Sequence, residues 1–295
     1  MVMKNLFTNK KLGLALGILF LLSACTNVID PKTHLIYPDK IISLSTSFGT
    51  IFSSESWFTA IFVYPISQAI NFLASYVGVF FSITLVTIAI KLFTLSFTIK
   101  STVASQKMQM INPELKRIQD KYAGKTDNQS KMAMGQEMNA LYAKHNINPF
   151  GAILIMFIQF PVIIAMYQAV QRADAVVNGS FFGSSLQLSP LGAFDQGIYI
   201  FMVIFILMGV FQFLSMKLPM WLQKLNNPVK EKKYAEGKKS GPNMDVMMYS
   251  SIGMIMFLAI NWPTAMSLYW LVTSIAQVGQ TVFIQYKYIN PSLGK

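Results

Sequence analysis

The chain has 295 residues, of which 53% are hydrophobic and 12% are charged, whereas roughly 25% of residues are charged in soluble domains. This composition and a mean hydropathy of +0.46 exclude a soluble globular enzyme and a disordered chain, and a single cysteine excludes an internal disulfide. Basic residues outnumber acidic ones by 24 to 12, and a membrane protein with this net charge of +12 is expected to keep its basic residues in cytoplasmic loops.

Residues 1–24 have the pattern of a secretory signal peptide. Three lysines precede an apolar stretch over residues 12–22, which is too short and wrongly flanked for a spanning helix. The ending Leu22-Ser23-Ala24-Cys25 resembles the lipobox of bacterial lipoproteins, which implies cleavage before Cys25 and acylation of its thiol, for example with palmitate. The alternative is an ordinary signal peptide that a cysteine follows by chance. We expect the mature chain to begin outside the membrane, tethered by these acyl chains.

Six apolar segments of about 20 residues follow Cys25 and are candidate membrane spans. They cover residues 57–77, 78–99, 149–170, 198–216, 244–261 and 264–286. Segments 100–145 and 217–245 carry eight basic against four acidic and seven basic against three acidic residues, so we expect them inside. Segments 26–77 and 171–197 carry a net negative charge, so we expect them outside.

These charges leave room for one span, not two, before residue 100. Two spans would place the basic segment 100–145 on the outer side. We predict that residues 57–77 form an interfacial amphipathic helix on the outer face, because Pro65, Gln68, Asn71 and Ser75 interrupt that segment. The predicted fold is therefore all-α, with five transmembrane helices, the N-terminus outside and the C-terminus in the cytoplasm.

The cytoplasmic segment 101–145 has a helical pattern. Asn112-Pro113-Glu114 is a good helix start, with Asn as the cap, Pro in the first turn and Glu complementing the helix dipole. Two apolar stripes recur at helical spacing, and residues 123–129 form a polar turn between them. The stripes are Met108, Ile111, Leu115, Ile118 and Tyr122, then Met134, Met138 and Leu141. We expect a helical hairpin that packs on itself or offers its methionines to apolar guests, rather than a solvated linker.

The second cytoplasmic loop, 217–243, is basic and has little apolar content. Its lysines are accounted for by the positive-inside rule alone, or by contact with the ribosome or anionic lipid. No interleaved aromatic residues favour specific nucleic-acid binding.

Lys91 is the one ionisable residue deep in a predicted span. It lies eight residues before the basic edge near Ile99, which at ~1.5 Å per residue is roughly 12 Å into the membrane. A lysine there costs about 3 kcal/mol on insertion scales, so water or a partner must satisfy it. No carboxylate lies deep in another predicted span, and we therefore expect a polar cavity open to the cytoplasm.

Polar residues of other spans are candidates to line this cavity. Alternatively, each makes a hydrogen bond between helices, which is the commoner role of Gln and Ser in spans. These residues are Gln159, Gln212, Ser274, Gln277 and Gln280.

Several motifs, taken in order, resemble those of the YidC/Oxa/Alb family of membrane protein insertases in its Gram-positive lipoprotein form. The resemblance covers about residues 57–287. It rests on the span with Lys91, then Lys107-Met108, Ile111-Asn112-Pro113-Glu114-Leu115, Lys144-His145-Asn146-Ile147-Asn148-Pro149, Gln159-Phe160-Pro161, Tyr167 and Trp262-Pro263-Thr264-Ala265-Met266-Ser267-Leu268-Tyr269-Trp270, with Gln277 and Gln280 beyond.

The resemblance implies five helices around a hydrophilic groove that is open to the cytoplasm and lipid. Lys91, Gln159, Gln212 and Trp270 match positions that face the groove. The implied partners are nascent membrane proteins, the Sec translocon, the lipid bilayer and, weakly, the ribosome. No cofactor, metal or bond chemistry is implied. The implied organisation is a signal peptide at 1–24, an extracellular segment at 25–77, an insertase core at 78–287 and a short cytoplasmic tail at 288–295.

Two departures from the family pattern stand out. The family's groove cation is usually Arg. Lys91 keeps the positive charge but lacks the planar guanidinium group, which binds a carboxylate through two parallel hydrogen bonds. Relatives often have Gly-Cys-x-Pro where this chain has Gly151-Ala152-Ile153-Leu154, which leaves the local helix geometry open.

Two other function classes compete with an insertase. A small-solute transporter with a buried lysine site would predict inverted repeats, and no convincing repeat is present. A membrane-embedded enzyme would need a catalytic constellation or a nucleotide motif, and neither is found, since His34 and His145 fall on opposite sides of the predicted membrane.

Overall fold

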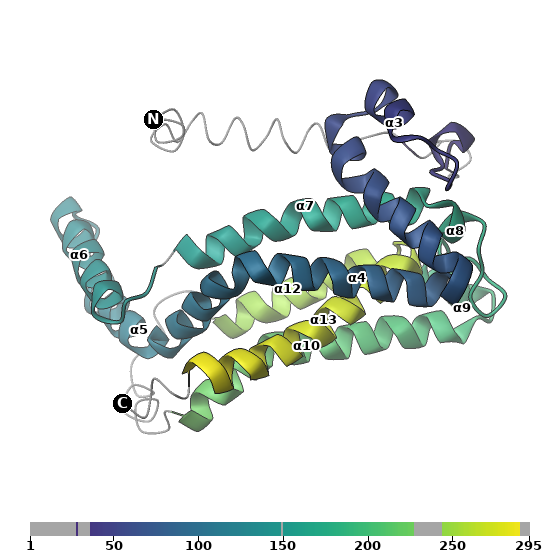
Figure 1. Cartoon of the computed structure of the whole chain (residues 1–295). Helices are drawn as coiled ribbons and strands as arrows, with labels where there is room; N and C mark the ends of the chain where they lie inside the picture. Colours follow the sequence, from purple (N-terminus) through teal and green to yellow (C-terminus); the bar gives the residue numbers. More distant parts are fainter. Residues whose placement is uncertain (1–27, 29–35, 149, 227–243, 290–295) are drawn as a thin grey trace. The chain divides into compact units, whose positions relative to one another are not determined.

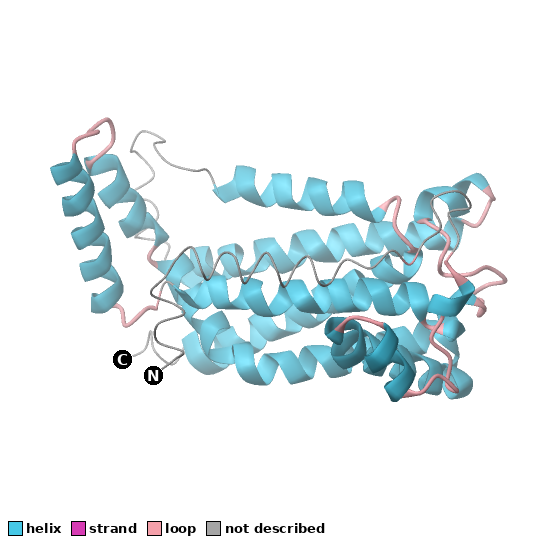
Figure 2. Ribbon diagram, turned by 90° about the horizontal axis from the view of Figure 1, so that it is seen from above, coloured by secondary structure: helices cyan, strands magenta, loops and turns pink. Residues whose placement is uncertain are grey.

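The computed structural model describes residue 28 and residues 36–148, 150–226 and 244–289 (Figure 1). Every regular element in these ranges is helical, as the cyan ribbons of Figure 2 show. The elements are η1 (Pro38–Lys40), α3 (Phe48–Ser54), η2 (Thr59–Val63), α4 (Tyr64–Met110), α5 (Asn112–Lys121), α6 (Asn128–Lys144), α7 (Phe150–Arg172), α8 (Asp174–Val177), α9 (Pro190–Asp195), α10 (Tyr199–Asn226), α12 (Met244–Ala259), α13 (Thr264–Ile284) and η3 (Gln285–Ile289). The predicted signal peptide with Cys25, residues 227–243 of the basic loop and residues 290–295 of the tail lie outside the described residues.

Two stretches of the described chain are long and apolar enough to cross a membrane by length and composition. One runs over residues 59–108, through η2 and α4, and the other over residues 199–222 of α10. Helix α12 adds a shorter apolar stretch at 248–259. The predicted spans 78–99 and 198–216 coincide with the first two stretches almost entirely, and the count of five spans remains a prediction.

The distribution of side chains is typical of a membrane protein. Large apolar side chains such as Phe93, Phe97 and Phe257 are exposed, whereas the polar side chains of Ser274 and Thr281 are buried. Apolar surface on this scale needs an apolar environment, and hydrocarbon requires that polar groups find partners inside the protein.

The described chain divides into two compact units, which are considered separately. The first unit contains residues up to 86 together with 160–188, and the second contains residues 87–159 and everything from residue 189 onward.

In the first unit, an extended segment around Ile42 is held between helices. The amide of Ile42 donates to the carbonyl of Arg172 at 2.7 Å, and its own carbonyl accepts from the amide of Asp174 at 3.0 Å. The side chain of Asn71 in α4 donates to the same carbonyl of Ile42 at 2.6 Å and accepts from the amide of Ala175 at 2.9 Å.

Two of the polar residues that interrupt segment 57–77 bind the preceding segment of the chain. Asn71 is buried, and Gln68 donates to the carbonyls of Ser43 and Thr46 at 2.8 and 3.1 Å. The interfacial position of this segment stays a prediction. Exposed apolar residues such as Phe72 and Tyr76 lie on the same helix. The side chains of Gln68 and Asn71 bind the segment around Ile42, because the backbone groups of an extended segment need hydrogen-bond partners.

Helix α4 is broken at Gly78, at the boundary that the sequence predicts between segments 57–77 and 78–99. Gly78 has φ 77° and ψ 166°, a conformation that residues other than glycine scarcely adopt. The helix therefore consists of two parts that meet at this residue.

In the second unit, α10 packs along α13, and Figure 1 shows the two running side by side. Helix α12 approaches α10 closely at Gly209, where an added Cβ would lie 2.8 Å from the sulfur of Met256. The amide of Leu191 in α9 donates to the carbonyl of Ile260 after α12, at 3.2 Å.

The hairpin of α5 and α6 is confirmed, and it has its own small core. Ile111, Leu115, Leu141 and Ile147 are buried together. Met108, Ile118, Met138 and Tyr142 pack against them, so most of both predicted stripes faces inward. One detail of the prediction is wrong, because α5 begins at Asn112 and Ile111 is its N-cap, without a side-chain cap bond.

Candidate functional site

Lys91 lies on α4 in the second unit and is partly buried. Its Nζ donates to Oε1 of Gln277 on α13, at 2.8 Å. No carboxylate of the described residues lies within 4.0 Å of this ammonium group. The described partner of this ammonium group is a neutral amide. An ammonium group has three donors, so one bond to Gln277 leaves two for other acceptors.

Helix α13 presents a polar face along which the neighbouring helices bond. Trp270, Ser274, Gln277 and Thr281 follow one another at intervals of four, three and four residues, which places them on one side of the helix. Of the two helices, α10 is long and apolar enough to cross a membrane by length and composition, and α13 is not among the described stretches that are.

Gln159 and Gln212 both bond to residues of α13. Nε2 of Gln159 in α7 donates to the hydroxyl of Tyr269 at 3.0 Å. Oε1 of Gln212 in α10 accepts from the hydroxyl of Ser274 at 2.6 Å. Further along α13, Nε2 of Gln280 donates to the hydroxyl of Thr102 in α4 at 3.2 Å.

All five polar residues that the sequence singled out, Gln159, Gln212, Ser274, Gln277 and Gln280, thus make hydrogen bonds between helices. Bonds between helices were one of the two roles considered for them. Such bonds still leave polar atoms for water or a guest, since a glutamine amide has an oxygen and two N–H groups.

Trp270 is largely buried and packs against a second indole. Its ring stacks on that of Trp262 with centroids 5.6 Å apart and an interplanar angle of 13°. Trp262 precedes Pro263, the N-cap of α13, so the stacked pair forms at the beginning of that helix.

A separate set of charges in the first unit was not predicted to form a site. Arg172, the last residue of α7, is fully buried and bonds to Glu55 at the end of α3, and Lys40 of η1 also bonds to Glu55 at 3.0 Å. The sequence carries no local signal for this set, because its members are 15 to 132 residues apart.

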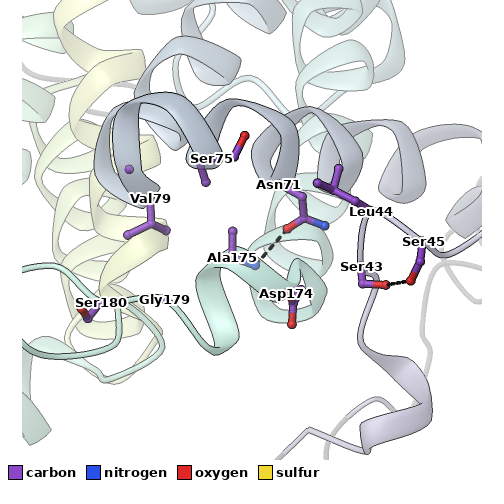
Figure 3. Close-up of a pocket in the computed structure, with 12 residues that line it drawn as sticks. Ser43, Leu44, Ser45, Asn71, Ser75, Val79, Asp174, Ala175, Gly179 and Ser180 are labelled. Carbon is purple, nitrogen blue, oxygen red and sulfur yellow. Dashed lines mark hydrogen bonds between the residues drawn. The ribbon is translucent and has the colours of Figure 1, made fainter.

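The first unit also contains an open pocket of about 630 Å³, which Figure 3 shows in close-up. Serine hydroxyl groups, the Asn71 amide and the Asp174 carboxylate meet there, next to apolar groups such as Val79. No lysine or arginine lines this pocket.

The described ranges contain no group of three or more His, Cys, Asp or Glu side chains that could hold a metal ion. What the second unit offers is a cation with free donors, next to amides and hydroxyls, on helices whose other faces are apolar. Such an arrangement can bind a carboxylate, or form hydrogen bonds with a polar segment, within an otherwise apolar protein.

Comparisons with known proteins agree with one another. The 60Kd inner membrane protein family matches residues 71–291 of this chain. The membrane protein insertase MisCA of Bacillus subtilis (strain 168) is 30% identical over 281 residues, which cover 94% of this chain and 92% of that protein.

Two further relatives carry the name YidC. Membrane protein insertase YidC 1 of Streptococcus pyogenes serotype M3 is 34% identical over 253 residues, 86% of this chain and 83% of that protein. Membrane protein insertase YidC of Oceanobacillus iheyensis is 30% identical over 283 residues, 93% and 96% of the two chains. The family match and these relatives together extend over nearly the whole chain, so the chain belongs to the 60Kd inner membrane protein family, which includes the YidC insertases.

Proposed function

We propose that this protein is a membrane protein insertase that inserts integral membrane proteins into the bacterial cell membrane and helps them to fold. One observation carries the proposal: the ammonium group of Lys91 lies among apolar helices with an amide as its described partner and no described carboxylate within 4.0 Å. The names of the relatives support the same function, and they do not support the alternative of a small-solute transporter.

In the proposed mechanism, five spanning helices enclose a hydrophilic groove that is open to the cytoplasm and to lipid. The hydrophilic part of an incoming chain enters the groove and so avoids crossing the full apolar layer. Lys91 attracts acidic groups on this part, and Gln159, Gln212 and Trp270 line its path. The apolar part of the client then moves into lipid, where burial at ~25 cal/mol per Å² drives it. No cofactor and no covalent step are required.

The proposed clients are nascent membrane proteins that have short, acidic segments to translocate. The protein acts on them alone or with the Sec translocon. The proposed ribosome contact is weak and uses the basic loop 217–243.

The test of this function is rescue of a bacterium depleted of its own insertase. Four forms are compared at matched membrane levels: wild type, Lys91→Arg, Lys91→Ala and Lys91→Glu. We expect wild type and Lys91→Arg to restore growth, and Lys91→Ala and Lys91→Glu to fail. Rescue by all four would remove Lys91 from the mechanism. Failure of well-expressed wild type, both in a Gram-positive and in a Gram-negative host, would contradict the insertase function.

The proposed topology and lipid anchor can be tested together, because the chain has one cysteine. We propose that Cys25 is acylated and lies outside, so its thiol does not react with maleimide. Single cysteines at Asn128, the first residue of α6, and at Phe182, in the 178–189 loop, then report the two sides. We expect Phe182→Cys to react in intact cells and Asn128→Cys to react only in opened cells. Labelling of Cys25 in the wild type would contradict the anchor.

A further inference from the structure

We propose that Gln277 is the second half of the site that receives client carboxylates, and that it works with Lys91 as a pair of donors on two helices. This inference rests on the proposed insertase function and assigns a residue to it. The pair is defined by the 2.8 Å bond from Nζ of Lys91 to Oε1 of Gln277, between α4 and α13.

The N–H donors of Lys91 and Gln277 that have no acceptor in the described structure make the pair a site for a carboxylate. Lys91 uses one of its three N–H donors on Gln277, and no other hydrogen bond of Lys91 or Gln277 side chains occurs in the described structure. The amide N–H₂ of Gln277 therefore stands beside the ammonium group without an acceptor. Two donors on neighbouring side chains match the two oxygens of an Asp or Glu carboxylate.

The other amides on these helices are used differently. The N–H₂ groups of Gln159 and Gln280 donate to the hydroxyls of Tyr269 and Thr102, respectively. Gln212 accepts a bond through its oxygen, but from the neutral hydroxyl of Ser274. Among these four glutamines, Gln277 alone combines a free amide N–H₂ with contact to a cation.

The bond also fixes the ammonium group in space. A lysine side chain is flexible, and a cation that could swing away would bind a carboxylate without a defined geometry. Oε1 of Gln277 keeps Nζ on the α13 side while leaving its charge uncompensated, since an amide carries no net charge. A carboxylate at position 277 would hold Nζ as well, but it would cancel the charge that attracts the client.

This contrast gives the decisive variants. Gln277→Met keeps the size of the side chain and removes both the acceptor and the amide donors. Gln277→Glu keeps the acceptor and neutralises Lys91. Gln280→Met and Gln280→Glu are matched controls, because they make the same changes one turn further along α13, at an amide that bonds to Thr102.

The experiment measures insertion into proteoliposomes of phosphatidylethanolamine and phosphatidylglycerol that contain the full-length protein. The client is a single-span protein whose translocated segment carries no, one or two Asp residues, and protease protection gives the inserted fraction. For wild type, we expect insertion to rise with each Asp. The quantity of interest is the ratio of the two-Asp client to the Asp-free client, since a merely structural defect lowers both alike.

We expect Gln277→Glu to abolish the dependence on Asp, and Gln277→Met to reduce the ratio by roughly tenfold, as for one lost hydrogen bond to a charged group. The Gln280 variants keep the wild-type ratio. The exchange Lys91→Gln with Gln277→Lys restores the pair with the charge on α13, and we expect it to recover the dependence on Asp.

The outcomes separate this inference from the proposed function. If the wild-type protein inserts clients but the Gln277 variants show the same ratios as the Gln280 variants, Gln277 has only a structural role and the inference is wrong. If the wild-type protein inserts none of the clients, the proposed function itself fails.

Discussion

The guanidinium group of Arg172 donates to both carboxylate oxygens of Glu55, at 2.9 and 3.4 Å, although the two residues are 117 positions apart. Arg172 is fully buried and the side chain of Glu55 is 5% exposed. Nε of Arg172 also donates to the carbonyl of Lys40 at 2.8 Å. One carboxylate thus joins the end of α3, the end of α7 and η1, and this connection gives the first unit its fixed N-terminal segment.

Replacing either partner of this pair should destabilise the protein strongly. In Arg172→Leu the buried Glu55 carboxylate keeps only Lys40, and in Glu55→Leu a buried guanidinium loses its counter-charge. Breaking a buried pair from one side costs about 3–5 kcal/mol, whereas removing both partners often costs much less. We expect the double variant to melt at a higher temperature than either single variant in detergent. A double variant as unstable as the sum of the two would show that the contribution is packing, not charge.

The break in α4 should depend on glycine at position 78. An added Cβ would find open space, so the cost of Gly78→Ala lies in the backbone conformation alone, about 1–3 kcal/mol. Gly253→Ala in α12 is the control, because its site is equally open and its backbone is helical. We expect the first variant to lower the melting temperature and the second to leave it unchanged or raise it. Equal melting temperatures for the two variants would contradict the strain argument.

The hairpin of α5 and α6 should unfold locally when its core is reduced. Leu115→Ala removes a buried side chain from a cluster that the hairpin and its flanks supply, at a cost of about 2–5 kcal/mol. Hydrogen exchange of the full-length protein should then show faster exchange in residues 112–144 and unchanged exchange in α10. Met132→Ala is the control, since that side chain is 68% exposed. Slower growth with Leu115→Ala but not with Met132→Ala would link this fold to insertion.

The same hairpin should be sensitive to acid through Glu137. Hydrogen bonds from Lys121 and from the hydroxyl of Tyr122 lower the pKa of this carboxyl below its usual value of 4.5. A carboxyl whose pKa is lower in the folded state stabilises that state above its unfolded pKa, and this contribution disappears as the pH falls through the folded pKa. Protection of α5 and α6 against exchange, corrected for intrinsic rates, should therefore decline below a pH of about 4.5 in wild type. In Glu137→Gln the decline should be smaller, and an identical decline would assign it to other groups.

Local patterns were sufficient to predict an all-helical chain and its hairpin. The apolar stripes that contain Leu115 and Leu141 predicted the hairpin and its inward faces, because helical periodicity depends on residues only three or four positions apart. The break at Gly78 coincides with the boundary between the apolar segments 57–77 and 78–99, although that boundary was not drawn from the conformational freedom of glycine. The sequence also singled out Lys91 as the one ionisable residue deep in a predicted span.

Pairings across the chain were not predictable in the same way. Nothing near Lys91 indicates that its acceptor lies 186 residues later, at Gln277. Asn71 and Gln68 were recognised only as polar interruptions of segment 57–77, because the sequence alone does not show which segment such side chains bind. The buried pair of Arg172 and Glu55 is a consequence of tertiary packing, which periodicity does not encode.

The polar face of α13 has a consequence for how the protein itself is made. Its Ser274, Gln277 and Gln280 find their partners on α10 and α4, which are synthesised earlier. Alone in hydrocarbon, this helix would carry unsatisfied amides and hydroxyls, whereas beside the earlier helices it has acceptors and donors in place. In the proposed five-span arrangement, α13 is thus itself a segment that needs help to enter the membrane, and α4 and α10 of the same molecule supply it.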